Sequence, residues 1–257
     1  MIWVLQKNLI NEVHVNEVIY VLDENEIPFE TLSVIPFSDD IEVKSNDPVK
    51  IPYGSTRLSM YAYRNNWKGM FFNENFKTSV WLDHRDDMLN NDVVILSLKE
   101  ARNFMKHFKE CEWFVRPDND LKEFSGECMM TSQFNELMDK LSGANGNLLN
   151  ENTRIVIAPS QEIGVEYRWF IVNGEVINGS LYRVNRRLLK NHVDDPLKIK
   201  HAQRLADKWL PHETCVMDTT RDKVIEFNCL NASGFYDHDI EKIILSITNY
   251  VKEKYNE

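Results

Sequence analysis

Hydrophobic positions change their spacing twice within the first 35 residues of the chain. Residues 2–5 form a short apolar run that is typical of a buried strand. Apolar side chains then recur at helical spacing, which predicts an amphipathic helix, at Val15, Val18, Ile19 and Leu22. Pro28 ends this helix, and residues 29–35 return to strand character. This order of elements predicts a βαβ unit with parallel strands and a right-handed crossover.

The next segments predict a third strand and two capped helices. Residues 49–53 are strand-like, and residues 54–56 (Gly-Ser-Thr) precede a helical pattern over residues 57–66. A glycine and hydroxyl groups before a helix occur both at anion sites and at ordinary N-caps, and we favour the N-cap here. Residues 97–100 have the spacing of a capping box, which predicts that another helix begins there.

A change in composition near Ser97 predicts a boundary between an N-terminal α/β domain, residues 1–96, and a second domain, residues 97–257. We therefore expect an α/β (α+β) protein whose second domain contains mainly antiparallel sheets. Asn173-Gly174 between two β-rich runs is a strong hairpin signal. The second domain is predicted to contain strands at 112–116, 153–158, 166–173 and 175–183, and helices at 131–141, 196–209 and 237–253.

Another predicted hairpin carries oxygen-bearing side chains where core residues are expected. Its strands are residues 215–218 and 224–228. Glu226 and Asn228 share one face because strand side chains repeat every two residues, and Asp218 lies in the first strand. Two carboxylates and an amide on a rigid sheet suit Mg²⁺, especially one that also binds nucleotide phosphates. The alternative is an ordinary hairpin whose acidic side chains face solvent.

The magnesium hypothesis depends on the register of this hairpin. If residues 221–222 alone form the turn, Asp218 lies opposite Ile225 and points away from Glu226. A longer loop or a β-bulge places Asp218 opposite Glu226 on the same face.

Composition narrows the class of protein. A chain of 257 residues with 43% hydrophobic content can bury a substantial core. The net charge of −10 argues against nonspecific binding to nucleic acid or to an anionic membrane, so neither partner is expected. The four cysteines lack the spacing of a metal site and predict reduced thiols. Neither a signal peptide nor an apolar run of roughly 18–20 residues is evident, so we expect a cytoplasmic protein.

Three further segments offer groups that suit nucleotide and substrate. Arg116 ends an apolar strand, and Lys122 follows in a loop with residues 125–126. Arginine binds phosphate oxygens bidentately and lysine adds a mobile charge, although a surface arginine paired with a nearby aspartate is the alternative. Residues 158–166 offer backbone groups for a purine and carboxylates for a ribose, or are a plain connecting loop. Residues 231–236 form a small-residue loop that a substrate can approach closely.

The order of these pieces resembles the ATP-grasp superfamily. It is most similar to the small lineage of phages and bacteria in which arginine replaces the strand-end lysine. The resemblance covers about residues 93–240, and its matching segments are residues 115–118, 122–126, 162–168, 180–183, 216–218 and 226–236. The N-terminal βαβ region is similar to the domain that precedes ATP-grasp domains. One departure is that only Ser125-Gly126 supplies flexibility after Arg116.

The resemblance implies a site for ATP and Mg²⁺. It places Arg116 and Lys122 on the phosphates and Asp218, Glu226 and Asn228 on one or two Mg²⁺ ions. It places adenine near the backbone from Ala158 to Gln161 and at Ile163, and the ribose at Glu162 or Glu166. Arg168 and Arg183 become candidates for binding an acyl-phosphate or an acceptor carboxylate, and Ser233 and Gly234 for binding substrate.

The implied activity is a ligase that activates a carboxylate with ATP as an acyl-phosphate and joins it to an amine of a peptide or a small molecule. A kinase that uses the same residues and a non-catalytic ATP-binding protein are the alternatives. We expect Asp218→Asn, Glu226→Gln and Arg116→Ala each to abolish nucleotide turnover without unfolding the protein.

Overall fold

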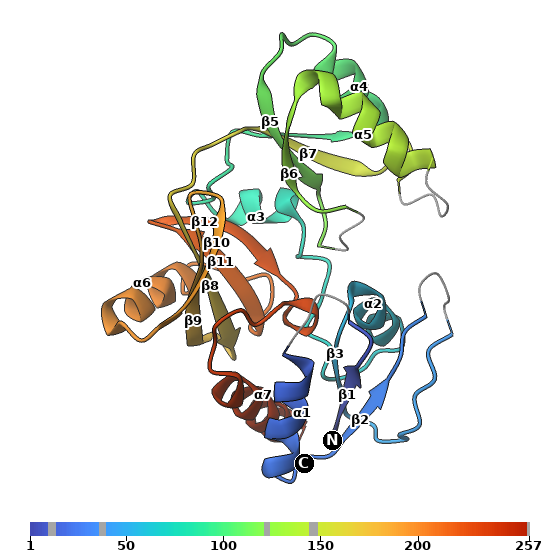
Figure 1. Ribbon diagram of the computed structural model, residues 1–257, viewed down its shortest axis with the longest axis vertical. Helices are drawn as coiled ribbons and strands as arrows, with labels where there is room; N and C mark the ends of the chain where they lie inside the picture. Colours follow the sequence, from blue (N-terminus) through green and yellow to red (C-terminus); the bar gives the residue numbers. More distant parts are fainter. Residues whose placement is uncertain (10–13, 36–39, 121–123, 144–148, 256–257) are drawn as a thin grey trace. The chain divides into compact units, whose positions relative to one another are not determined.

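The computed structural model describes residues 1–9, 14–35, 40–120, 124–143 and 149–255 (Figure 1). The chain forms two compact units. Residues 1–74 and 164–257 make up the large unit, and residues 75–163 make up the small unit. These units are defined by internal packing and divide the chain at other points than Ser97, so the assignment of domains to residues 1–96 and 97–257 stays a prediction.

The N-terminal part of the large unit is the predicted βαβ arrangement with a third parallel strand. The sheet order is β2-β1-β3, and both pairings of the central strand β1 are parallel. Ser55 caps helix α2 by accepting a hydrogen bond from the amide of Leu58 at 3.4 Å, as predicted. The elements are β1 (Ile2–Gln6), α1 (Val15–Glu24), β2 (Phe29–Leu32), β3 (Lys50–Tyr53) and α2 (Thr56–Arg64).

The C-terminal part of the large unit is a five-stranded antiparallel sheet of order β10-β9-β8-β11-β12. Asn173 and Gly174 both have positive φ angles, 52° and 80°, and form the predicted turn between β8 and β9. Strand β10 was not predicted from the sequence. The elements are β8 (Val165–Val172), β9 (Glu175–Val184), β10 (Arg187–Val193), α6 (Pro196–Ala206), β11 (Cys215–Thr220), β12 (Lys223–Asn228), the 3₁₀ turn η1 (Leu230–Ala232) and α7 (Ile240–Tyr255).

The two sheets of the large unit share one hydrophobic core. Helices α1 and α7 lie side by side (Figure 1), and Leu22 and Ile244 from these helices are fully buried in this core. Phe170 and Phe235 stack with their ring centroids 5.2 Å apart and join the five-stranded sheet to the same core. The indole nitrogen of Trp3 donates to the Thr248 hydroxyl of α7 at 3.0 Å, which satisfies a polar group that folding removes from water.

The small unit contains a four-stranded antiparallel sheet of order β4-β7-β5-β6. Helices α4 and α5 pack next to each other (Figure 1) over a core that includes Val115, Phe134 and Ile155. Ser97 and Glu100 form the predicted capping box at the start of α4. The elements are α3 (Thr78–His84), β4 (Val94–Ser97), α4 (Leu98–Met105), β5 (Glu112–Pro117), β6 (Glu127–Met130), α5 (Thr131–Gly143) and β7 (Arg154–Pro159).

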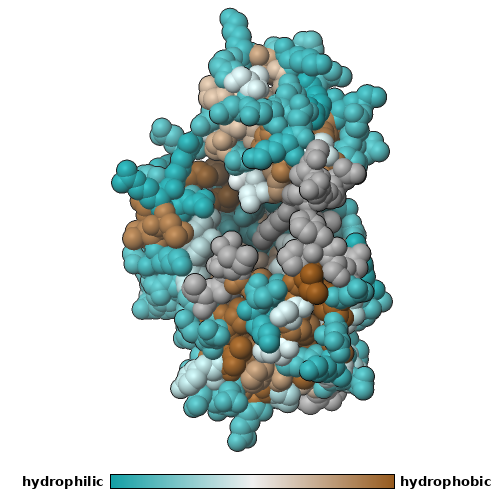
Figure 2. All heavy atoms as spheres, turned by 45° about the vertical axis from the view of Figure 1, so that its right-hand side comes forward, coloured by the Kyte–Doolittle hydropathy of each residue, from teal (hydrophilic) through white to brown (hydrophobic). Residues whose placement is uncertain are grey.

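The surface and the helices agree with the polar composition of the chain. The face shown in Figure 2 is largely hydrophilic and carries separate hydrophobic patches. Among the described residues, no helix combines the length and the apolar character that crossing a membrane requires. All four cysteines are free thiols.

Gly179 gives a test of packing within the five-stranded sheet. It lies directly opposite Trp169, and a Cβ at this position would be 2.2 Å from the Cζ3 atom of that indole. Trp169 is only 3% exposed and has no room to withdraw. We expect Gly179→Ala to lower the free energy of unfolding by about 1–3 kcal/mol, measured by urea denaturation.

Gly164→Ala is the matched control, because a Cβ at Gly164 would meet no heavy atom within 4 Å. It should change the free energy of unfolding by about 0.5 kcal/mol or less. Equal stability of the two variants would contradict this account of the packing.

Candidate active site

The β11–β12 hairpin positions the two acidic side chains that were predicted to bind metal. Its turn consists of residues 221–222, because Thr220 pairs with Lys223. A register shift between Asp218 and Thr219 then brings Asp218 directly opposite Glu226. Such a bulge inserts one residue into one strand and turns the following side chains. The geometric condition set by the sequence is therefore met by the bulge rather than by a longer loop.

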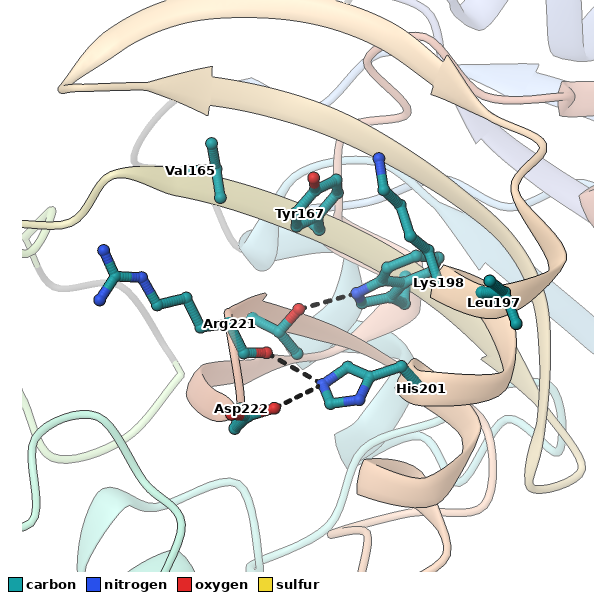
Figure 3. Close-up of a pocket in the computed structure, with 9 residues that line it drawn as sticks. Val165, Tyr167, Leu197, Lys198, His201, Arg221 and Asp222 are labelled. Carbon is teal, nitrogen blue, oxygen red and sulfur yellow. Dashed lines mark hydrogen bonds and ion pairs between the residues drawn. The ribbon is translucent and has the colours of Figure 1, made fainter.

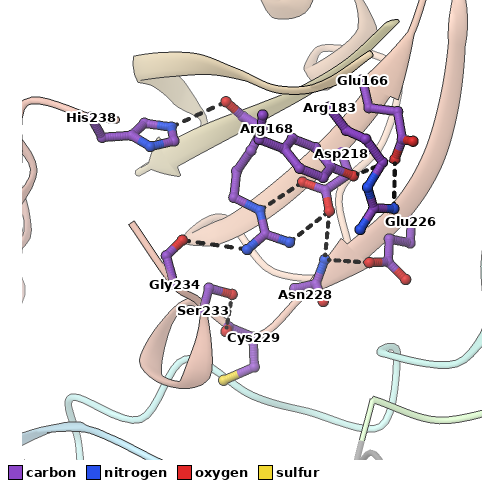
Figure 4. Close-up of polar contacts among 11 residues, drawn as sticks. Glu166, Arg168, Arg183, Asp218, Glu226, Asn228, Cys229, Ser233, Gly234 and His238 are labelled. Carbon is purple, nitrogen blue, oxygen red and sulfur yellow. Dashed lines mark hydrogen bonds and ion pairs between the residues drawn. The ribbon is translucent and has the colours of Figure 1, made fainter. Parts of the chain in front are cut away.

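Asp218 is paired with Arg168 of the neighbouring strand β8 (Figure 4). The Nε and Nη2 atoms of Arg168 donate to the two carboxylate oxygens of Asp218 at 2.8 and 2.7 Å. Asp218 is fully buried, and Arg168 is 8% exposed. The third donor, Nη1, reaches the backbone oxygen of Gly234 at 3.3 Å. Burial opposes the charge of Arg168, yet its attraction to Asp218 raises the pKa of the guanidinium above its ordinary value.

Asn228 connects the two carboxylates. Its amide nitrogen lies 3.4 Å from Oδ2 of Asp218 and 3.2 Å from Oε1 of Glu226. Burial raises the pKa of the Asp218 carboxyl to about 6, and the nearby Glu226 adds to the rise while Arg168 opposes it. The site therefore holds more negative charge than one guanidinium balances.

This arrangement fits a magnesium ion. Within the described residues no cluster of three or more His, Cys, Asp or Glu side chains is arranged to hold a metal, and the set here is two carboxylates and an amide. All three supply hard oxygen donors, and an added cation would relieve the repulsion between Asp218 and Glu226. Each carboxylate oxygen has a second lone pair, so the pairing of Asp218 with Arg168 leaves it able to bind a cation. The assignment of these residues as ligands is a proposal.

Glu166 lies on the same sheet and is held by two partners (Figure 4). The hydroxyl of Tyr182 donates to its Oε2 atom at 2.7 Å, and Nη1 of Arg183 lies 3.4 Å from the same oxygen. Burial and the surrounding carboxylates raise the pKa of Tyr182 above its ordinary value, so the phenol remains a donor. Glu166 is 4% exposed, whereas the side chain of Arg183 is 42% exposed. Arg183 therefore has donors directed elsewhere than to Glu166.

Two tyrosines to which the sequence analysis gave no role enclose Arg168. The rings of Tyr182 and Tyr236 stack with their centroids 4.9 Å apart and are nearly parallel. The guanidinium carbon of Arg168 lies 5.5 Å from the first ring centroid and 4.9 Å from the second. Cation–π contacts of this kind hold a guanidinium in one orientation. Tyr236 has a φ angle of 53°, a conformation that is strained for a bulky residue.

The loop after β12 has a supporting role in this structure. The hydroxyl of Ser233 donates to the backbone oxygen of Cys229 at 2.8 Å, and Ser233 is 2% exposed. Gly234 contributes its carbonyl to Arg168. Burial lowers the pKa of His238 to about 4, so its neutral ring lies between the carbonyls of Phe235 and Arg168. The predicted substrate role of Ser233 and Gly234 stays a prediction.

In the small unit, Arg116 lies near the end of strand β5 as predicted. It is 8% exposed, its guanidinium carbon lies 5.3 Å from the ring centroid of Trp81, and its Nε donates to the backbone oxygen of Pro117 at 3.2 Å. Asp118, the suggested partner of Arg116, instead accepts hydrogen bonds from Ser79 and Arg154. Lys122 lies outside the described residues.

The predicted adenine segment follows strand β7 of the small unit. Ala158 is buried opposite Phe114 in the sheet. Gln161 donates through Nε2 to the backbone oxygen of Leu89 at 3.0 Å. Glu162 is exposed and Ile163 is partly buried, and neither lies in a regular element. Their assignment to the nucleotide stays a prediction.

A pocket of about 370 Å³ opens on the other face of the five-stranded sheet (Figure 3). Tyr167 and Trp169 line it, and they alternate along β8 with Arg168, so they point away from Asp218. Their rings stack with centroids 5.8 Å apart, and Lys198 of α6 lies over the Tyr167 ring. This pocket is therefore separate from the carboxylate cluster.

The burial of the Arg168–Asp218 pair changes the expectation for Asp218→Asn. This variant leaves the Arg168 charge buried with half of its partner removed, so we now expect a loss of about 3–5 kcal/mol in the free energy of unfolding. The double variant Arg168→Met/Asp218→Leu removes both charges and should be more stable than Asp218→Asn alone. Urea denaturation of both proteins measures the difference.

The control is Asp139→Asn, because Asp139 is 72% exposed and pairs with Arg102 at 2.7 Å. Loss of this surface pair should cost about 1 kcal/mol or less. An Asp218→Asn protein as stable as Asp139→Asn would show that the buried pair contributes little.

Comparison with known proteins agrees with this site. A family model of the ATP-grasp domain, clade family 2, matches residues 89–244. No curated protein matched the chain. D-alanine–D-alanine ligase from Bacillus anthracis has a similar structure, with a TM-score of 0.64, 12% identity and coverage of 98% of this chain and 99% of that chain.

Two further solved structures share the fold. The D-cycloserine synthetase DcsG has a TM-score of 0.62 and 10% identity, and the match covers 98% of this chain and 100% of that chain. The ATP-grasp ligase PsnB, complexed with a minimal precursor, has a TM-score of 0.54 and 12% identity, and the match covers 98% of this chain and 99% of that chain. Because the family model spans more than half of the chain, this protein belongs to the ATP-grasp superfamily, in the clade family that the model describes.

Proposed function

We propose that this ATP-grasp protein joins a carboxylate to an amine at the expense of ATP, with the Asp218–Glu226–Asn228 cluster as its Mg²⁺ site. At the level of class, ATP-dependent carboxylate–amine ligation with ATP and Mg²⁺ follows from the family and the fold. The identities of the two substrates and the roles of single residues are what the proposal adds.

The observation that carries the proposal is the convergence of two carboxylates and one amide on the β11–β12 hairpin beside a buried arginine. Asp218 and Glu226 lie opposite each other, and Asn228 is within hydrogen-bond distance of both. A bound Mg²⁺ would neutralise phosphate charge and polarise the bond to the transferred phosphoryl group. Asp218 is kept in one orientation by Arg168, so this arginine is a positioning residue rather than a substrate ligand.

The reaction needs little proton chemistry from the protein. A substrate carboxylate oxygen attacks the γ-phosphorus of ATP, the bond to the β-phosphate oxygen breaks, and ADP leaves. The amine then attacks the acyl carbon, loses a proton and expels inorganic phosphate. Such transfers are accelerated mainly by positioning and by positive charge near the developing negative charge.

Residues of both units are assigned to the substrates in this proposal. Arg116 and Lys122 bind nucleotide phosphates, and Glu166 accepts the ribose hydroxyls. The Tyr182 hydroxyl supports the ribose role because it fixes one oxygen of Glu166 and leaves the other to act as an acceptor. Arg183 is assigned to the acyl-phosphate or the acceptor carboxylate, since its exposed guanidinium has donors besides the one directed at Glu166.

The structural relatives act on substrates of different size. One is a ligase of D-alanine, and PsnB was crystallised with its precursor peptide PsnA2 and AMPPNP. The fold therefore accommodates both small molecules and peptides, and we propose a carboxylate and an amine drawn from one of these classes.

The class of reaction is tested by the dependence of ADP formation on the two substrates. With a pool of carboxylates, we expect the purified protein to release ADP and phosphate only when an amine pool and Mg²⁺ are also present. Coupled ADP assays and mass spectrometry of the products measure this. A stable phosphorylated product would instead indicate a kinase, and tight ATP binding without ADP in any substrate pool would indicate a non-catalytic ATP-binding protein.

The metal role of Glu226 is tested by Glu226→Gln. This change keeps the size of the side chain but removes one negative charge from the proposed magnesium site. We expect ADP formation to fall by about 10²–10³-fold, with an unchanged melting temperature and a higher Mg²⁺ requirement. The control is Glu175→Gln, an exposed residue at the start of β9. Equal activity of both variants and the unchanged protein would remove Glu226 from the site.

A further inference from the structure

One stretch of this acidic protein contains no acidic residue. Residues 176–193 include none of the 40 aspartates and glutamates of the chain, although they contain four of its 30 lysines and arginines. The four are Arg183, Arg186, Arg187 and Lys190. Because the chain as a whole carries a net charge of −10, this stretch is a local region of opposite sign.

The structure places these basic residues on the β9–β10 hairpin at the edge of the five-stranded sheet. Among the described strands, β10 has β9 as its one neighbour, so its other side offers backbone donors and acceptors. Residues 187–192 are all exposed. Two large apolar side chains stand among the cations, with Leu188 61% and Leu189 43% exposed.

The hairpin is continuous with the candidate active site. Arg183 lies beside Glu166, and the Nζ of Lys190 lies 5.8 Å from the ring centroid of Tyr236, which packs on Arg168. The backbone amide of His192 donates to the carboxylate of Asp237 at 2.9 Å, which ties the end of the hairpin to the loop after β12. A molecule bound along β10 would therefore lead toward Arg183 and Tyr236.

Charges on an edge strand have a general alternative explanation. Lysines and arginines at an edge keep two sheets from pairing and prevent aggregation. That explanation accounts for the cations but not for the two exposed leucines, which would themselves promote aggregation. It also does not account for the position of the hairpin beside the carboxylate cluster.

We propose that the β9–β10 hairpin binds an extended acidic peptide segment of the substrate, which adds to the sheet as a strand beside β10. Backbone hydrogen bonds to β10 provide affinity, Leu188 and Leu189 contact apolar side chains, and Arg187 and Lys190 pair with carboxylates. The inference rests on the proposed ligase function, because it names a peptide as the molecule that supplies the carboxylate or the amine.

The first experiment measures binding of a defined probe by fluorescence anisotropy. The probe is a labelled twelve-residue peptide with glutamate and valine in alternation, and its partner peptide carries glutamine in place of glutamate. We expect the acidic peptide to bind at least tenfold more tightly than the glutamine peptide, with an affinity that falls as salt is raised. N-methylation of every second backbone amide should weaken binding, because it blocks one row of strand hydrogen bonds.

The second experiment reverses the charges of the hairpin. Arg187→Glu/Lys190→Glu should lower the affinity for the acidic peptide by about tenfold or more while binding of Mg²⁺-ATP stays unchanged. The matched control is Lys106→Glu/Lys140→Glu, which changes the net charge equally at exposed positions of the small unit. Equal loss in both variants, or no loss in either, would overturn the proposal.

The two proposals fail in different ways. A protein that forms ADP with small carboxylates and amines but does not distinguish the acidic peptide from the glutamine peptide retains the ligase function and loses the docking surface. A protein that binds the acidic peptide through Arg187 and Lys190 but forms no ADP in any substrate pool retains the docking surface and loses the ligase function.

Discussion

The buried ion pair between Arg168 and Asp218 is the interaction on which the rest of the candidate site depends. It joins strands β8 and β11, and through Gly234 it also holds the loop after β12. An isolated charge at this depth would be strongly unfavourable, so each partner is retained in the folded state by the other. The aromatic rings of Tyr182 and Tyr236 complete the enclosure of the guanidinium. Asp218 is therefore held rigidly in the position that metal binding requires.

The alternation of side chains along a strand divides the functions of the five-stranded sheet. On β8, Glu166 and Arg168 face the carboxylate cluster, and Tyr167 and Trp169 face the pocket beneath α6. Further along the first face, the apolar Phe170 enters the core shared with α1 and α7. The polar cluster is thus built on strands whose other contacts are hydrophobic and rigid, which limits the movement of its ligands.

The distribution of charge separates two kinds of substrate contact. At the centre of the cluster, the carboxylates outweigh the one guanidinium that pairs with them, and the excess favours a metal cation. At the edge, residues 176–193 of the β9–β10 hairpin carry cations and no acids, and the excess there favours an anionic partner. Arg183 lies at the transition, because it pairs with Glu166 and is still 42% exposed. A substrate that carries carboxylates is attracted to this end of the sheet despite the net charge of −10.

Features that depend on a few neighbouring residues were determined by the sequence: the βαβ unit, the Asn173-Gly174 turn, the capping box at Ser97 and the superfamily. The tertiary structure alone decided which groups meet. It supplied the bulge that turns Asp218 toward Glu226, and the pairing of Arg168 with a residue 50 positions away in the chain. It also supplied the edge strand β10, whose polar sequence lacks a strand-like alternation. Short windows of sequence encode local backbone preference, whereas these features arise from register and packing between distant segments.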